Sequence, residues 1–257
     1  MNLIEAVIFS IVEGITEFLP VSSTGHLNLV RVLLNIPKTD FFTTFEIFIQ
    51  LGSILAVIFL YGNIVLKNKE YWKKIITAFI PTAIIGLTFG KFIKNYLISN
   101  EYITLIALFL GGIILIFFEI FYKEKDHHIE RIELITYPQA AIIGIFQSLA
   151  MIPGVSRSAS TILGALFLGT KRNTAIEFSF LLAIPTMIAA AIFSIKDAYF
   201  NFSTNESLLM MVGILVSFIM AIFTIKWLVN FIKSNSFIPF GIYRIIISII
   251  FYIFILN

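Results

Sequence analysis

EGITEFLPVSSTGH, residues 13–26, puts two glutamates, a proline, four hydroxyl side chains and a histidine inside the apolar run 3–34. A second stretch, QSLAMIPGVSRSAST at residues 147–161, interrupts the apolar run 137–168 in the same way. Each stretch breaks at a proline and then offers small hydroxyl residues with one basic residue. Ionisable residues at membrane depth are rare and usually functional. We therefore expect the function to reside in these two stretches.

The rest of the sequence is typical of a polytopic membrane protein. Of its 257 residues, 59% are hydrophobic and only 13% are charged, and the mean hydropathy is +0.98. Six apolar runs approach the roughly 20 residues that a helix needs to cross a bilayer: 41–61, 76–94, 102–122, 175–195, 208–226 and 238–256. The absence of cysteine excludes disulfides and thiolate metal sites. A net charge of +3 without a long basic face argues against nucleic acid as a partner.

The two interrupted runs predict re-entrant helix–loop–helix hairpins, because each half is too short to span the bilayer. Irregular backbone at membrane depth persists only where it is buried in protein or lines a wet cavity. The order is then hairpin, three spans, hairpin, three spans. We expect an all-α polytopic membrane protein with six transmembrane helices and two re-entrant hairpins, forming a single membrane domain over residues 1–257.

This order is also an internal repeat. Repeat 1 covers 1–122, repeat 2 covers 137–257, and a cytoplasmic linker, 123–136, joins them. A shift of about 132 residues brings Ser23 near Ser156. An odd number of spans in each repeat inverts the second half, and sites in such inverted repeats form near the midplane from broken helices.

The distribution of lysine and arginine favours one orientation in the membrane. With a loop at 62–75 placed in the cytoplasm, the cytoplasmic segments carry more lysine and arginine than the outer segments, as the positive-inside rule requires. Both chain termini would then face outward.

The first stretch combines a carboxylate pair with a cluster of hydroxyl groups. Glu13 and Glu17 are four residues apart and share one helix face. Their charges repel, so one keeps a proton or a cation binds between them; a hydrated helix end is the simpler alternative. Ser22, Ser23 and Thr24 could cap the next helix, or could join free backbone N–H groups in binding an anion.

The second stretch adds a phosphate-binding side chain. Its hydroxyl residues Ser156, Ser158, Ser160 and Thr161 repeat the arrangement of the first stretch. Arg157 offers a planar fork suited to phosphate oxygens, or it could pair with a glutamate and hold the hairpins together. His26 could act as a general acid or could be a satisfied core histidine. Together these groups predict phosphoryl transfer on a lipid substrate.

In these motifs the chain resembles the undecaprenyl-diphosphatase family, also called undecaprenyl pyrophosphate phosphatases or bacitracin-resistance proteins. The resemblance covers nearly the whole length. Beyond residues 13–26 and 153–161, three supporting segments match: FEIFIQLGSILA at 45–56, EFSFLLAIP at 177–185 and SFIPFGIYR at 236–244.

This resemblance implies an enzyme of the bacterial cytoplasmic (inner) membrane that hydrolyses undecaprenyl diphosphate to undecaprenyl phosphate and phosphate, which recycles the lipid carrier for cell-wall synthesis and confers bacitracin resistance. The implied cofactor is Mg²⁺ or Ca²⁺, held by Glu13 and Glu17, and the active site is expected to open to the outer face. Implied catalytic residues are Glu13, Glu17, Ser23, His26 and Arg157; implied substrate-binding residues are Ser22, Thr24, Ser156, Ser158 and Thr161. Ser23 or a water molecule would be the nucleophile. The expected partners are the polyprenyl diphosphate lipid and the bilayer, and a homodimer stays open.

The main rival interpretation is a transporter or flippase of a polyprenyl phosphate lipid, because inverted repeats with opposed hairpins are typical of transporters. A nucleophile with an acid–base set favours the enzyme. Lipid phosphatases with a histidine nucleophile are excluded, since they need a histidine six residues after a Ser-Arg pair, where this chain has Leu163. Glu46 and Glu177 are expected to have structural roles, and Arg244 is expected to find a carboxylate or a backbone carbonyl partner.

Overall fold

The computed structural model describes residues 1–97, 101–195 and 202–256, and their regular secondary structure is helical throughout. The α-helices are α1 (Leu3–Thr16), α2 (Ser23–Leu33), α3 (Asp40–Lys67), α4 (Lys69–Phe92), α5 (Glu101–Phe121), α6 (Tyr137–Ser148), α7 (Arg157–Phe167), α8 (Arg172–Ile195), α9 (Thr204–Ile232) and α10 (Ile238–Leu256). Short π or 3₁₀ turns lie at Ile93–Leu97, Ile132–Leu134 and Leu149–Met151. The expected all-α membrane architecture is confirmed.

Five helices within the described ranges are long and apolar enough to cross a membrane. They lie at Asp40–Asn63, Lys69–Gly90, Glu101–Phe121, Arg172–Ser194 and Thr204–Ile232, and they match the first five expected spans. The sixth expected span corresponds to α10, whose described apolar part, Ile238–Ile253, is shorter.

The predicted loop at 62–75 is wrong. Helix α3 continues to Lys67 and α4 begins at Lys69, so Asn68 alone separates the two helices. Asn68 caps α4, because its side-chain oxygen accepts a hydrogen bond from the Glu70 backbone N–H at 3.1 Å. The polar residues that suggested a loop are good helix formers, and they extend both helices beyond their apolar parts.

The two interrupted runs form two pairs of short helices, α1 with α2 and α6 with α7, of 14, 11, 12 and 11 residues. The helix starts correspond at an offset of 134 residues, Leu3 with Tyr137 and Ser23 with Arg157. Both pairs begin with a capping box, in which the N-cap residue and the third residue of the helix exchange side-chain-to-backbone hydrogen bonds. The predicted offset of about 132 is therefore two residues short.

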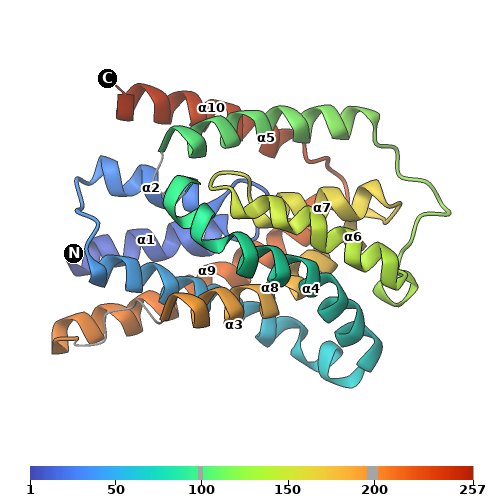
Figure 1. Cartoon of the computed structure of the whole chain (residues 1–257), viewed down its shortest axis with the longest axis horizontal. Helices are drawn as coiled ribbons and strands as arrows, with labels where there is room; N and C mark the ends of the chain where they lie inside the picture. Colours follow the sequence, from blue (N-terminus) through green and yellow to red (C-terminus); the bar gives the residue numbers. More distant parts are fainter. Residues whose placement is uncertain (98–100, 196–201, 257) are drawn as a thin grey trace.

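The two pairs enter from opposite ends of the molecule, and their turns meet in the middle (Figure 1). Both chain termini lie at the end where α1 begins, whereas the linker between α5 and α6 lies at the other end (Figure 1). Helix α1 packs against α9 and, in the matching arrangement of the other half, α6 packs against α4. Helices α3 and α8 also pack together, as do α5 and α10.

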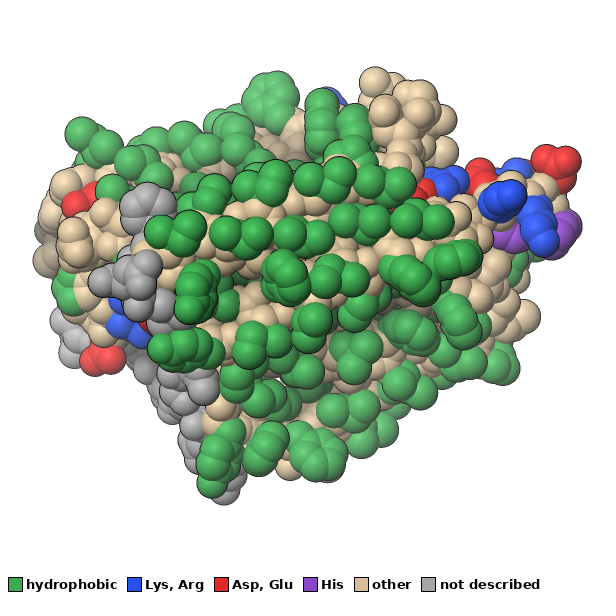
Figure 2. Space-filling model, turned by 90° about the horizontal axis from the view of Figure 1, so that it is seen from above, with side chains coloured by type: hydrophobic (Ala, Val, Ile, Leu, Met, Phe, Trp, Pro, Cys, Tyr) green, Lys and Arg blue, Asp and Glu red, His purple; other side chains and the backbone are tan. Residues whose placement is uncertain are grey.

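Apolar side chains cover the middle of the surface seen in Figure 2, and charged side chains gather at the end that carries the linker. The linker is tied to the end of the α6–α7 pair: Ile129 N–H donates to Gly169 O at 2.9 Å, and Lys171 Nζ lies 2.9 Å from a Glu130 carboxylate oxygen. The Lys171 side chain lowers the pKa of Glu130, first through this hydrogen bond and then through its charge.

Candidate active site

Two serines with unusual backbone geometry mark the turns where the helix pairs meet. Ser22, directly before α2, has φ +70°, and Ser156, directly before α7, has φ +78°. Residues other than glycine are uncommon in this left-handed region, and such strain tends to persist where the surrounding structure enforces it, often at functional sites. The two turns thus share one strained geometry, and Ser23 and Arg157 occupy equivalent positions in them.

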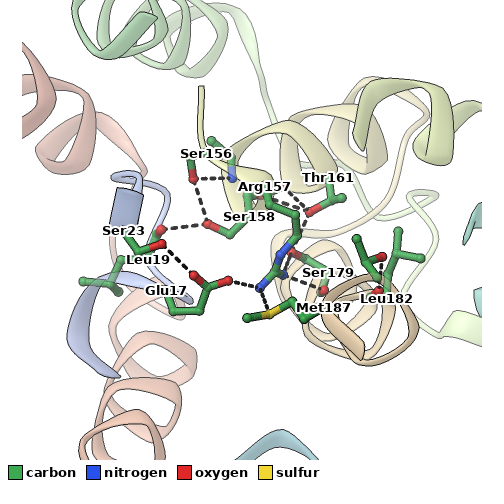
Figure 3. Close-up of polar contacts among 12 residues, drawn as sticks. Glu17, Leu19, Ser23, Ser156, Arg157, Ser158, Thr161, Ser179, Leu182 and Met187 are labelled. Carbon is green, nitrogen blue, oxygen red and sulfur yellow. Dashed lines mark hydrogen bonds and ion pairs between the residues drawn. The ribbon is translucent and has the colours of Figure 1, made fainter. Parts of the chain in front are cut away.

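Glu17 connects the two helix pairs (Figure 3). One carboxylate oxygen accepts a hydrogen bond from Ser23 Oγ at 2.6 Å, and the other accepts from an Arg157 Nη at 2.9 Å. Both ion-pair side chains are largely buried, with 8% of the Glu17 side chain and 12% of the Arg157 side chain exposed. The carboxylate therefore contacts a hydroxyl from one pair and a guanidinium from the other.

Arg157 is held from the opposite side by α8. Its second Nη donates to the backbone oxygen of Ser179 at 3.0 Å, and the Ser179 hydroxyl lies 2.6 Å from Thr161 Oγ1 (Figure 3). Within the described part of the chain, the buried Arg157 Nε has no hydrogen-bond partner. An unpaired buried donor is costly, so this N–H suits an anionic ligand. Ser179 was not predicted, although it lies in the matching segment EFSFLLAIP.

The predicted hydroxyl groups differ in their contacts. Ser158 Oγ donates to the Leu19 backbone oxygen at 2.7 Å and so joins the two turns, while Ser156 Oγ accepts from the Ala159 backbone N–H at 3.2 Å. The N-cap interpretation is thus confirmed for Ser156. Ser22 makes no side-chain cap bond, and Thr24 is exposed on the first turn of α2.

His26 faces α10 and not the carboxylate of Glu17. Its Nδ1 lies 2.8 Å from the Ser22 backbone oxygen and its Nε2 lies 2.7 Å from the hydroxyl of Tyr243. A carbonyl oxygen can only accept, so Nδ1 carries a proton. Within the described part of the chain, His26 has no hydrogen bond to Glu17, Ser23 or Arg157. Tyr243, whose ring stacks on His26 with centroids 5.4 Å apart, was not predicted.

Glu13 is fully buried, and neither of its carboxylate oxygens has a hydrogen-bond partner among the described residues. Glu17, Glu46 and Arg157 lie close enough to interact with it electrostatically. Such a carboxylate needs a proton or a cation. No group of three or more histidine or acidic side chains in the described ranges is arranged to hold a metal ion. A cation here would need oxygen ligands besides these carboxylates, such as backbone oxygens, water or substrate.

Comparison with known proteins decides the family. The model of the family described as "Bacitracin resistance protein BacA" matches residues 6–250. The chain belongs to the BacA family. The predicted family membership is thereby confirmed, and the BacA match includes both turns and all of the side chains described above.

Curated relatives with the name undecaprenyl-diphosphatase match over nearly their whole length. The protein of Sulfurihydrogenibium sp. (strain YO3AOP1) is 51% identical over 253 residues, which cover 98% of this chain and 99% of the relative. The protein of Persephonella marina is 48% identical over 256 residues and is covered completely, as is this chain. The protein of Aquifex aeolicus is 50% identical over 252 residues, which are 98% of each chain.

Proposed function

We propose that this BacA-family chain hydrolyses undecaprenyl diphosphate to undecaprenyl phosphate and inorganic phosphate, and that it thereby recycles a cell-wall lipid carrier and confers bacitracin resistance. The names of its relatives support this substrate. The observation that carries the proposal is the position of Glu17, which accepts hydrogen bonds from Ser23 and Arg157 at once. The Glu17 carboxylate thus links a nucleophile, for which it can act as the base, to a guanidinium that can bind phosphate.

Ser23 is the proposed nucleophile. Its Oγ attacks the terminal phosphorus while Glu17, 2.6 Å away, takes the hydroxyl proton. The new bond is Oγ–P, and the bond that breaks joins this phosphorus to the bridging oxygen, which leaves with the lipid as undecaprenyl phosphate. Water then attacks the phosphoserine, a proton returns to Ser23 Oγ, and inorganic phosphate is released.

Arg157 and the two helix starts are the proposed phosphate-binding groups. The unpaired Arg157 Nε donates to a phosphate oxygen. The first backbone N–H groups of α2 and α7 add partial positive charge on either side of the turns. Ser22 and Thr24 lie where the turn between α1 and α2 leads into α2, and their hydroxyls are proposed to bind substrate there. Ser156, Ser158 and Thr161 act indirectly, because their hydroxyls hold the turns and Ser179 in place.

Mg²⁺ or Ca²⁺ is the proposed cofactor, because carboxylate oxygens suit both ions and Mg²⁺ usually completes its coordination with water and substrate phosphates. Glu13 and Glu17 would hold it, since the Glu13 oxygens lack other partners. When bound, the cation neutralises charge that develops on the diphosphate oxygens.

His26 is the proposed proton carrier for the departing lipid phosphate. Its Nδ1–H is fixed by the Ser22 oxygen, which orients the ring, and its Nε2 is the exchangeable position. Tyr243 supplies the hydrogen bond at Nε2. With Nδ1 protonated, the Nε2 of the neutral ring accepts a hydrogen bond from the Tyr243 hydroxyl, so His26 would give up a proton at Nε2 only from its doubly protonated form. Tyr243, which is 42% exposed, would connect Nε2 to solvent for reprotonation.

In the membrane, we propose that α1–α2 and α6–α7 are re-entrant hairpins in an inverted-topology repeat, and that α10 is the sixth span. The opposed directions of the two pairs and the matching contacts of α1 with α9 and α6 with α4 support this arrangement. With the linker 123–136 on the cytoplasmic side of the bacterial inner membrane, the α1–α2 hairpin opens to the outer face. Fusion reporters at both termini test this topology, and a cytoplasmic C-terminus would contradict it.

Phosphate release from undecaprenyl diphosphate in detergent or proteoliposomes tests the function. The purified chain should release one phosphate per lipid with added Mg²⁺ or Ca²⁺. A transporter would instead move labelled lipid between leaflets without releasing phosphate. If no phosphate is released with any added cation, the proposed phosphatase activity is refuted.

A further inference from the structure

Arg244 is a fully buried arginine on α10 whose guanidinium binds only backbone oxygens among the described residues. Its bonds run from Nε to Leu108 O (3.3 Å), from one Nη to Pro20 O (3.2 Å) and Val155 O (3.0 Å), and from the other Nη to Ala107 O (3.1 Å) and Gly154 O (2.9 Å). A guanidinium has five N–H donors, and all five are used. The expected carbonyl partners of Arg244 are thus confirmed.

These carbonyl groups belong to three separate parts of the chain. Pro20 lies in the turn between α1 and α2, two residues before the strained Ser22. Gly154 and Val155 lie in the turn between α6 and α7, directly before the strained Ser156. The remaining two belong to α5. One side chain therefore joins both turns to a long helix, just before the residues that carry Ser23 and Arg157.

The charge of Arg244 has no carboxylate partner in the described part of the structure. Burying a charge is unfavourable by several kcal/mol unless it is paired or well hydrogen-bonded. Apolar residues could fill this space without that penalty. The five carbonyl contacts are what the arginine adds, and they fix the distance between the two turns.

The packing of α5 against α10 leaves a space that fits this guanidinium. A Cβ added at Gly111 would collide with an Nη atom of Arg244 and would lie 2.7 Å from its Cζ. On the next residue, a Cβ at Gly112 would lie 2.7 Å from the Gly241 backbone oxygen. The two helices approach closely there, and Gly111 leaves open the path that the side chain takes toward the turns.

We propose that Arg244 is a positioning residue for the hydrolysis: it sets the spacing of the two turns so that Arg157 reaches Glu17 while Glu17 holds Ser23. It touches none of the reacting groups itself. Its kinetic consequence rests on the proposed function, whereas its structural consequence, the spacing of the turns, does not.

The variants are Arg244→Met, Arg244→Lys and Gly111→Ala, with Gly90→Ala as the matched control because a Cβ at Gly90 has nothing within 4 Å. Lysine has three donors and keeps at most three of the five contacts. Gly111→Ala keeps the arginine and displaces it. If Arg244→Met does not fold, Arg244→Lys and Gly111→Ala still test whether Arg244 sets the spacing of the two turns.

Two measurements are made on each variant. The first is kcat and KM for phosphate release. The second is the distance between spin labels at cysteines introduced at Leu33 and Phe167, equivalent exposed residues at the ends of α2 and α7, in a chain that has no native cysteine. The labelled parent protein must retain its activity.

We expect Arg244→Met to lower kcat about 100-fold, the size of effect that a misplacement of 1 Å can have, with a smaller change in KM. Arg244→Lys should recover part of the rate, Gly111→Ala should lose about 10-fold or more, and Gly90→Ala should match the parent. The label distances should shift or broaden in the same order. A folded Arg244 or Gly111 variant with unchanged label distances overturns the proposal, whether its kcat falls or not. If the parent protein releases no phosphate, the proposed function is refuted, but the label distances still test whether Arg244 sets the spacing of the two turns.

Discussion

Replacing Glu17 with glutamine is the sharpest test of the site, because the substitution keeps the shape of the side chain and removes its charge. The amide oxygen can accept from the Arg157 Nη, which only donates, and the amide N–H₂ then faces Ser23 Oγ. The hydrogen bond at 2.6 Å is therefore reversed or lost, and the glutamine side chain cannot take the Ser23 hydroxyl proton.

Two effects of the substitution are comparable in size and must be separated. General-base catalysis contributes about 10²- to 10⁴-fold, which corresponds to about 3–5 kcal/mol in the barrier. Removal of one partner of a buried ion pair also destabilises by about 3–5 kcal/mol, because the other charge stays buried and unpaired. A loss of activity in Glu17→Gln alone could therefore come from unfolding.

The double variant Glu17→Gln/Arg157→Gln distinguishes the two effects. It removes both charges, so the apparent melting temperature in detergent should recover relative to either single variant, while phosphate release should stay at least 100-fold below the parent. Glu5→Gln is the matched control on the same helix, since glutamine also serves in a capping box. A Glu17→Gln protein with parental kcat at the same cation concentration would refute the role of Glu17 as the base.

Three further substitutions test the other roles. Ser23→Ala should abolish phosphate release. Ser160→Ala should not, because among the described residues the Ser160 hydroxyl bonds only to Ser156 O, one helix turn back. Equal rates in the two variants would show that Ser23 is not the nucleophile. Glu13→Gln should raise the cation concentration needed for half-maximal rate about 10-fold and reduce the rise in melting temperature on adding Mg²⁺; an unchanged response would show that Glu13 is no ligand. Tyr243→Phe should lower kcat about 2- to 10-fold, the value of one hydrogen bond, and a parental kcat would separate Tyr243 from proton transfer.

The sequence predicted the helical architecture well because hydrophobic run length is a direct physical signal. Five expected spans and both pairs of short helices appear close to their predicted places. The error at 62–75 has a clear cause: hydropathy marks where a helix leaves the apolar layer, not where it ends. The expected shift of about 132 residues paired Ser23 with Ser156, whereas the strained backbone positions pair Ser22 with Ser156 at an offset of 134.

The contacts that the residues of the two motifs make could not be predicted from the sequence. The ion pair between Arg157 and Glu17 had been an alternative to phosphate binding, and it is what the structure contains. Ser179 and Tyr243 were missed because single hydroxyl residues in apolar helices give no periodic signal. Their roles arise only from the approach of α8 and α10 to the turns, which depends on tertiary packing.

The proposed internal repeat would explain why the proposed chemistry is divided between the two pairs of short helices. At the offset of 134 residues, Glu13 corresponds to Gln147 and Ser23 to Arg157. Gln147 uses its amide to bind Thr82 Oγ1 at 2.9 Å and Thr186 Oγ1 at 3.2 Å, so it is a satisfied neutral group, whereas the Glu13 oxygens have no hydrogen-bond partner among the described residues. Two copies of the first hairpin would bring four carboxylates together, and two copies of the second would bring two arginines together; either set would repel itself. Two helix pairs with opposite charges avoid both conflicts, and one carboxylate, Glu17, joins a hydroxyl from one pair to a guanidinium from the other.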